Sequence, residues 1–146
     1  MAITTKVLLD GPRTLSIWMT NDGATDETTA ALKVDRDGTS HSTQPSGSVA
    51  TIPRKTLDVL AIEEVYWSVD TFDFVAIEWN FNAADETAIL LGAGEGYIDF
   101  RENGVLVPAT SRDTAQAADG DIQLLTADDQ AAGNYTIKLR LRKKWT

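Results

Sequence analysis

The last stretch of the chain, residues 135–145, constrains the fold more than any other segment. Apolar and basic residues alternate along it with a period of two, which in a β-strand places the two sets on opposite faces. We therefore predict a long strand with one face toward a core and the other toward solvent, a strand that is stable only within a larger sheet. The apolar set is Tyr135, Ile137, Leu139 and Leu141, and the basic set is Lys138, Arg140 and Arg142.

The rest of the sequence also favours β structure. No long window places apolar residues at helical spacing, whereas turn dipeptides recur between short runs rich in Thr and Val. A chain of 146 residues is long enough to bury one core. We predict an all-β fold, a single antiparallel β-sandwich domain spanning residues 1–146 and jelly-roll-like. The dipeptides are Asp10-Gly11, Asp22-Gly23, Asp37-Gly38, Asn103-Gly104 and Asp119-Gly120.

These turn signals divide the chain into short predicted strands. One hairpin is expected across Asp10-Gly11-Pro12 and a second across Asp70-Thr71, where the aromatic residues of the two strands would pack together. Before residues 135–145, the predicted strands are residues 6–9, 13–20, 31–34, 57–69, 72–81, 88–91, 97–100, 105–107 and 122–126. Long polar connections are predicted at residues 21–29, 35–51 and 108–119; loops of such length in a compact domain are usually functional or disordered.

Two strands have faces that can be assigned from their alternation. Leu15, Ile17 and Met19 share one face of residues 13–20, and Trp18 lies on the opposite, polar face. Residues 57–69 have apolar side chains on both faces, so we expect this strand to be covered on both sides. Its first face carries Leu57, Val59, Ala61, Val65, Trp67 and Val69, and its second face carries Leu60, Ile62 and Tyr66.

Charge and composition exclude several classes of protein. The net charge is −9, which argues against nucleic acid as the main partner, because phosphate binding needs a basic surface. No apolar run approaches the roughly 20 residues that span a bilayer, so no membrane partner is expected. The N-terminus lacks the pattern of a signal peptide, and the chain has no cysteine, which fits a protein made in a reducing cytoplasm.

Four patterns suggest chemistry, and each has a simpler interpretation. His41 has no partner set for catalysis and fits a surface loop. Residues 92–96, GAGEG, resemble a nucleotide loop, but a strand follows them, so a hairpin connection with positive φ is favoured. Residues 35–38, DRDG, start like a calcium loop that is not completed. The acidic pairs Glu63-Glu64 and Asp85-Glu86 are interpreted as solvated surface charge. We therefore predict no catalytic residue, no cofactor and no metal site.

Six residues are the best candidates for contact with a partner. An exposed Trp can serve as an oligomer contact or as a platform for a sugar. A basic strand on an acidic protein suits docking onto a surface of complementary charge, although the same side chains can simply solvate the outer face of the strand. The candidates are Trp18, Lys138, Arg140, Arg142, Lys144 and Trp145.

Three segments together resemble a family of small β-rich virion proteins of tailed bacteriophages. In that family a strand pair bearing Trp precedes a GYLDF-like turn, and a strand starting GDI and a terminal YxIxLxLRKxW-like strand follow. The resemblance covers roughly residues 57–146, and the terminal motif is its most specific part. The segments in this chain are IEEVYWSVD with FVAIEWNF, then GEGYIDFRENG, then GDIQLLTADDQAAGNYTIKLRLRKKW.

The resemblance implies a structural role without enzymatic activity. Its best specific form is a capsid decoration or cement protein on the outer surface of the head, bound to the major capsid protein and self-associated as a homotrimer. A neck, tail or baseplate component is the second alternative. A carbohydrate-binding module on a receptor-binding tip, using Trp18 or Trp145, is the third.

Overall fold

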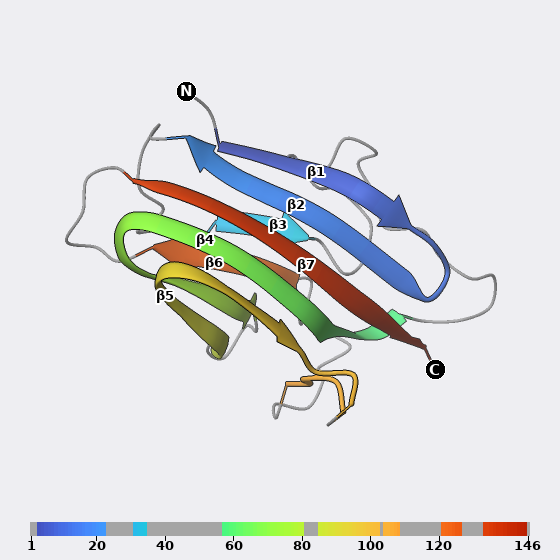
Figure 1. Ribbon diagram of the computed structural model, residues 1–146. Coiled ribbons are helices and arrows are strands. Elements are labelled where there is room, and N and C mark those ends of the chain that lie inside the picture. Colours follow the sequence, from blue (N-terminus) through green and yellow to red (C-terminus); the bar gives the residue numbers. More distant parts are fainter. Residues whose placement is uncertain are drawn as a thin grey trace.

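The computed structural model describes residues 3–22, 31–34, 57–80, 85–102, 104–108, 121–126 and 133–145, and most of these residues lie in β-strands (Figure 1). No helix occurs within these ranges, so the all-β prediction is confirmed. The strands are β1 (Ile3–Asp10), β2 (Thr14–Asp22), β3 (Ala31–Val34), β4 (Leu57–Asn80), β5 (Glu86–Asp99), β6 (Asp121–Thr126) and β7 (Asn134–Trp145).

All the strands belong to one antiparallel sheet in the order β1-β2-β7-β4-β6-β3, with β5 pairing β4 on the other side. The hairpin predicted at Asp10-Gly11-Pro12 is confirmed: β1 and β2 pair antiparallel, and the Gly11 amide donates to the Thr14 carbonyl at 2.9 Å. The last strand is central in the sheet, because β7 lies between β2 and β4 (Figure 1). The alternating motif of residues 135–145 therefore joins the N-terminal hairpin to the rest of the sheet.

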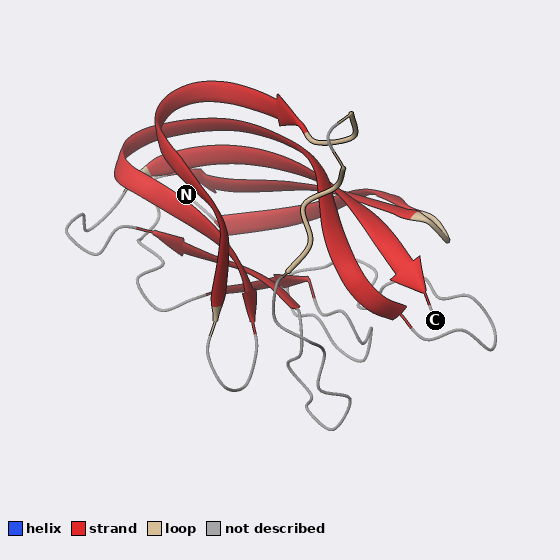
Figure 2. Ribbon diagram, turned by 90° about the horizontal axis from the view of Figure 1, so that it is seen from below, coloured by secondary structure: helices blue, strands red, loops and turns tan. Residues whose placement is uncertain are grey.

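The sheet bends back on itself at the middle of β4. Residues 57–70 of β4 pair with β7, whereas residues 75–80 pair with β6. Between them Thr71 has a φ of 81°, a conformation that β-branched residues rarely adopt. The half of the sheet that contains β6 and β3 consequently lies across the half formed by β1, β2 and β7 (Figure 1), and the strands arch around the interior (Figure 2).

The hairpin predicted across Asp70-Thr71 is wrong. The chain continues through this point as a single strand of 24 residues, and its two halves never pair with each other. The physical reason is the burial of Phe72, which is fully buried and whose ring lies 6.4 Å from that of Tyr135. The tip of a tight hairpin would expose this side chain to water.

The hairpin connection predicted at residues 92–96 is also wrong, because β5 continues through it. Gly94 does have the positive φ expected there, at 109°. Opposite these residues the pairing of β4 with β5 jumps from Val69↔Gly94 to Phe74↔Gly92. The glycines therefore let β5 follow the bend of β4 instead of reversing the chain.

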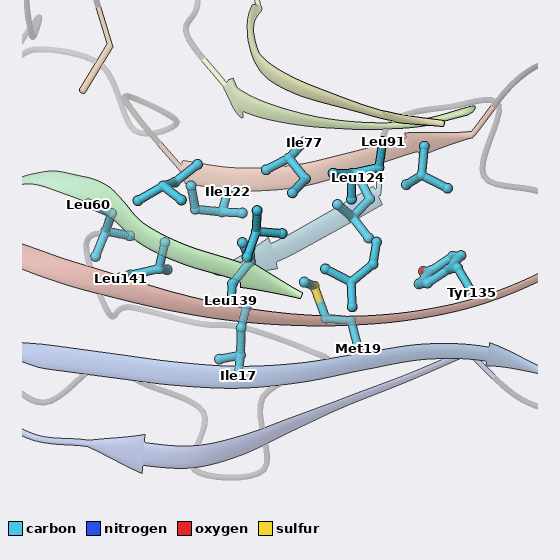
Figure 3. Close-up of a cluster of buried hydrophobic side chains, with 14 of the residues drawn as sticks. Ile17, Met19, Leu60, Ile77, Leu91, Ile122, Leu124, Tyr135, Leu139 and Leu141 are labelled. Carbon is cyan, nitrogen blue, oxygen red and sulfur yellow. The ribbon is translucent and has the colours of Figure 1, made fainter. Parts of the chain in front are cut away.

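One hydrophobic core lies between the two halves of the sheet (Figure 3). As predicted, the alternate apolar residues of β2 and β7 point into it, and all of them are at most 1% exposed. A hydrogen bond also joins the two halves of the sheet, because the indole Nε1 of Trp79 in the second half donates to the Leu60 carbonyl in the first half at 2.9 Å. Side chains from the two halves that meet there include Ile17, Met19, Leu139 and Leu141 on one side and Ile77, Leu91, Ile122 and Leu124 on the other.

Several predictions on connections fall outside the described residues. Asn21 and Asp22 belong to β2, so the predicted loop at 21–29 begins two residues too early, and its remainder is not described. The loop at 35–51, which contains His41 and residues 35–38, also lies outside the description, as does nearly all of 108–119. The predicted strand at 105–107 is reduced to one bridge, Ile62↔Leu106.

Candidate functional site on the outer face of the sheet

The face of β1, β2, β7, β4 and β5 that points away from the core carries most of the candidate residues, and we call it the outer face. Residues that pair directly in an antiparallel sheet project to the same side. The pairing Lys6↔Trp18↔Lys138↔Tyr66↔Tyr97 therefore places five side chains in one line across five strands. This line, the cross-strand row, combines three aromatic rings with two lysines.

The cross-strand row is open to solvent. Trp18 and Tyr66 are each 37% exposed and Tyr97 is 56% exposed. The alternation in β2 and β7 correctly predicted that Trp18 and Lys138 face away from the core. The contribution of Tyr97 was missed, because only the register between β4 and β5 shows that it stands beside Tyr66.

Glu63 reaches the outer face because β4 contains a β-bulge at that residue. Ile62 pairs with Leu141 and Glu64 with Arg140, which leaves Glu63 as one extra residue. A bulge changes which alternate residues face the core. Leu60 and Ile62 accordingly face the core before the bulge, and Val65 does so after it.

The faces predicted for residues 57–69 therefore do not hold across the bulge, although Leu60 and Ile62 do share a face, as do Val65 and Trp67. Ala61 and Val65 were assigned to the same face, but the bulge separates them, and Ile62 and Tyr66 likewise lie on opposite faces. The sequence did contain a signal for this change, since Glu63 is a charged residue within an otherwise apolar alternation.

Two basic residues of β7 bind Glu63. The Nε of Arg140 donates to Oε2 of Glu63 at 3.0 Å, and the Nε of Arg142 donates to Oε1 at 2.7 Å. Glu63 is 5% exposed, whereas the two arginine side chains are 41% and 46% exposed. The interpretation of Glu63 as solvated surface charge is therefore wrong. It is a buried carboxylate that organises the basic strand.

A second set of charges continues from Glu64 to the end of β5. The Tyr97 hydroxyl donates a short hydrogen bond to Oε2 of Glu64, and Arg101 lies 3.4 Å from Oε1 of the same carboxylate. Arg101 also binds both carboxylate oxygens of Asp99, at 3.0 and 2.8 Å. The hydrogen bonds from Arg101 lower the pKa of Asp99 to about 2, and the hydrogen bond to Glu64 raises the pKa of Tyr97 above its ordinary value.

The basic strand is consequently less positive than its sequence suggests. Arg101, Arg140 and Arg142 are balanced by three carboxylates, those of Glu63, Glu64 and Asp99. We call these six residues the arginine–carboxylate network.

Two candidate cations of β7 stand outside this network. Lys138 and Lys144 are exposed, and neither makes an ion pair with any residue in the described ranges. The backbone of Trp145 pairs with Leu57 at the end of β7, and its side chain is outside the description.

A pocket of about 270 Å³ opens on the outer face where the row and the network meet. Two of its walls are aromatic, Tyr66 and Tyr97, and the other lining residues are polar or charged. Trp18 pairs in register with Lys138, one of the lining residues, but does not itself line the pocket. The lining residues are Ser16, Glu64, Tyr66, Tyr97, Lys138 and Arg140.

Lys143 behaves differently from its neighbours in the basic strand. Its side chain is fully buried and pairs with the Asp10 carboxylate, and its Nζ donates to the Gly11 carbonyl at 2.8 Å. The period of two predicts this orientation, since Lys143 is an odd-numbered residue like Leu141. Lys143 thus joins the end of β7 to the first hairpin and takes no part in the outer face.

The remaining candidates for chemistry do not gather into a site within the described ranges. No group of three His, Asp or Glu side chains there is arranged to hold a metal ion. Asp85 is exposed and Glu86 half-buried. In the described part of the chain, no helix has the length and apolar character needed to cross a membrane.

Comparison of the chain with protein-family models, with curated proteins and with solved structures returned no match.

Proposed function

We propose that this chain is a structural protein of a tailed-phage virion and that it acts as a capsid decoration or cement protein. In this proposal it is a single jelly-roll-like β-sandwich domain on the outer surface of the head. Its partners are the major capsid protein and further copies of itself, arranged as a homotrimer at three-fold positions. Its role is structural and needs no cofactor.

The observation that carries the proposal is the placement of the three segments that bear the resemblance. The first forms β4, the second is the end of β5, and the third forms β6 and β7. The strands β5, β6 and β7 each pair directly with β4. Segments separated by tens of residues in the sequence thus form one continuous part of the sheet, which supports treating the resemblance as one of fold.

A cement role requires many modest contacts acting together. Symmetric copies bound at several points gain avidity without any single strong contact, and this holds a lattice together against internal pressure. A rigid sheet with an exposed aromatic and cationic face suits such contacts. We propose Trp18, Lys138, Arg140, Arg142, Lys144 and Trp145 as the docking surface.

The decisive experiment is the copy ratio of this chain to the major capsid protein in purified particles, measured by quantitative mass spectrometry. A decoration protein covering the head is expected near parity. A ratio far below parity would instead place the chain at the neck, tail or baseplate, which is the second candidate and shares the same fold. Absence from particles would contradict both.

The docking surface is best tested at Lys144. Lys144→Glu reverses an exposed charge that has no ion-pair partner among the described residues, so the fold is expected to survive while binding to particles weakens. Arg140→Glu is a poorer probe, because it would put a third carboxylate beside Glu63 and Glu64. Undiminished particle binding by Lys144→Glu, with an unchanged thermal unfolding curve, would remove Lys144 from the docking surface.

A further inference from the structure

The pocket on the outer face combines two aromatic side chains with four polar or charged ones and approaches a small-ligand site in size. Its volume of about 270 Å³ is close to the lower end of ligand pockets, roughly 300–1,000 Å³. Its lining residues come from four adjacent strands, β2, β7, β4 and β5. Backbone pairing within the sheet therefore holds the walls of the pocket, and no loop is needed to order them. Sites on sheet strands keep their geometry better than sites on loops.

The aromatic side chains form a platform for a ring-shaped ligand. Tyr66 and Tyr97 are direct cross-strand neighbours, and Trp18 lies two strands away in the same row. With neighbouring strands about 4.8 Å apart, the cross-strand row is roughly 19 Å long. An extended chain of rings can therefore lie across the strands and stack on several side chains at once.

The charges around the pocket favour an anionic ligand. Glu64 is already bonded to Tyr97 and Arg101, and its charge is matched within the arginine–carboxylate network. Lys138 lines the pocket and has no ion-pair partner among the described residues. Arg140 also lines the pocket, and its side chain is 41% exposed, but its charge is already matched by Glu63 within the network, which leaves Lys138 as the unmatched cation. The unmatched charge in the pocket is thus positive.

We propose that this pocket binds an acidic saccharide, a pyranose chain that carries carboxylate groups. The apolar face of a sugar ring stacks on Tyr66 and Tyr97, and its carboxylate pairs with Lys138 and Arg140. This places the sugar contact on β4 and β5, whereas the sequence suggested Trp18 or Trp145. The site belongs to the isolated chain and does not depend on the virion role.

Single-stranded nucleic acid is the competing ligand, because it also combines rings with negative charge. The chain carries a net charge of −9, and a strand of phosphates needs a groove of several cations. The pocket offers only Lys138 and Arg140, so the saccharide is favoured.

The test is a titration of the purified full-length chain, followed by isothermal calorimetry and by backbone amide shifts. The probes are an oligogalacturonate of four residues, a neutral oligosaccharide of the same length, inorganic sulfate and a short single-stranded oligonucleotide. We expect the acidic saccharide to bind most tightly and to shift the amides of Tyr66, Tyr97 and Lys138. Equal or tighter binding of any other probe, or shifts confined to other residues, would overturn the proposal.

Two variants and two matched controls separate stacking from charge. Lys138→Gln is expected to weaken binding of the acidic saccharide roughly tenfold, because a charge-assisted hydrogen bond is lost. Tyr66→Ala is expected to weaken it about three- to tenfold, and Tyr66→Phe to keep it. Lys144→Gln is the control for charge, since it lies about 20 Å along β7 from Lys138, beyond the screening length. If Lys144→Gln weakened binding as much as Lys138→Gln does, the loss would come from the overall charge of the protein. That result would contradict a binding site in the pocket.

Discussion

Glu63 shows how one residue sets the character of a whole surface. An extra residue at a bulge turns its carboxylate between two arginines of the neighbouring strand, where it is almost out of contact with water. A buried carboxylate is tolerated only if it is paired and hydrogen-bonded. The pair of arginines meets that requirement, and each guanidinium group is in turn held by one carboxylate oxygen of Glu63. The same contact offsets much of the positive charge of the basic residues in β7.

Replacing this carboxylate is expected to cost stability. Glu63→Gln keeps the shape but loses the charge that both arginines bind, so the free energy of unfolding should fall by about 1–2 kcal/mol. The lower end is favoured because both arginines are nearly half exposed and their interaction is screened by solvent. Urea unfolding measures the change. Glu95→Gln, an exposed residue of β5, is the matched control, and an equal loss in both variants would contradict a special role for Glu63.

The Tyr97 hydroxyl is expected to report on Glu64. The folded chain raises the pKa of Tyr97 above 10.0, first through its hydrogen bond to Glu64. Folding therefore favours the protonated phenol. The stabilisation is fully present below the unfolded pKa and is lost as pH rises through the folded pKa.

Absorbance at 295 nm during an alkaline titration follows this group. Tyr97→Phe should remove a late-titrating phenol, and Glu64→Gln should move the Tyr97 transition to lower pH. A Glu64→Gln titration identical to that of the wild-type chain would show that the hydrogen bond does not set the pKa.

At the scale of elements, the paired bends of β4 and β5 fold one sheet back across itself around a core. Dipeptide chemistry predicted reversals at both places, because Asp70-Thr71 and the glycines at 92–96 look like turns when only their neighbours in sequence are considered. What decides the outcome is the burial of Phe72 against Tyr135, a residue that lies far away in sequence. Local propensity cannot report on such a partner. The positive φ at Gly94 was predictable, whereas the path of the chain through it was not.

Three glycines of β5 provide a graded test of this bend. Gly92→Ala meets nothing within 4 Å and should be neutral or stabilising by about 0.4–1 kcal/mol. Gly94→Ala also finds open space, but its φ of 109° should cost about 1 kcal/mol. Gly96→Ala would push its new methyl group into the ring of Trp67, which should cost about 1–3 kcal/mol.

Chemical denaturation of the three variants in parallel gives the order of stability. Gly92→Ala is the internal control, because it adds the same methyl group to the same strand. The bend described here would be wrong if Gly92→Ala were the most destabilising of the three.

At the scale of the whole molecule, the fold depends on β7, which joins the N-terminal hairpin to the rest of the sheet. Four apolar side chains of β7, those of Tyr135, Ile137, Leu139 and Leu141, are buried in the core. At about 1.5–3 kcal/mol for each, they contribute about 6–12 kcal/mol, which is comparable with the total stability of a domain. The alternation in the sequence predicted this strand and the direction of its side chains. It could not predict that β7 stands between β2 and β4, because strand order depends on contacts far apart in the chain.

The same limit applies to the candidate site. Trp18 and Lys138 could be placed on one outward face from alternation alone. The pocket between Tyr66 and Tyr97 could not, because it exists only through the register of β4 with β5 and the bulge at Glu63.

Removing β7 should therefore prevent folding altogether. A chain that ends at residue 133 is expected to lose the β signal in far-UV circular dichroism and the dispersion of its amide resonances. A synthetic peptide of residues 134–146 should restore both when added, and a peptide of the same composition in scrambled order should not. A well-dispersed spectrum from the truncated chain alone would show that the sheet forms without its central strand.

The central place of β7 also has a consequence for synthesis on the ribosome. At 5–20 residues per second, roughly 6–24 seconds separate the emergence of β2 from that of its partner β7, which starts 120 residues later. During this interval the apolar face of β2, formed by Leu15, Ile17 and Met19, has no strand beside it except β1. The nascent chain therefore exposes an apolar hairpin face during this interval, and residues 14–20 are the expected target of chaperones that bind apolar segments.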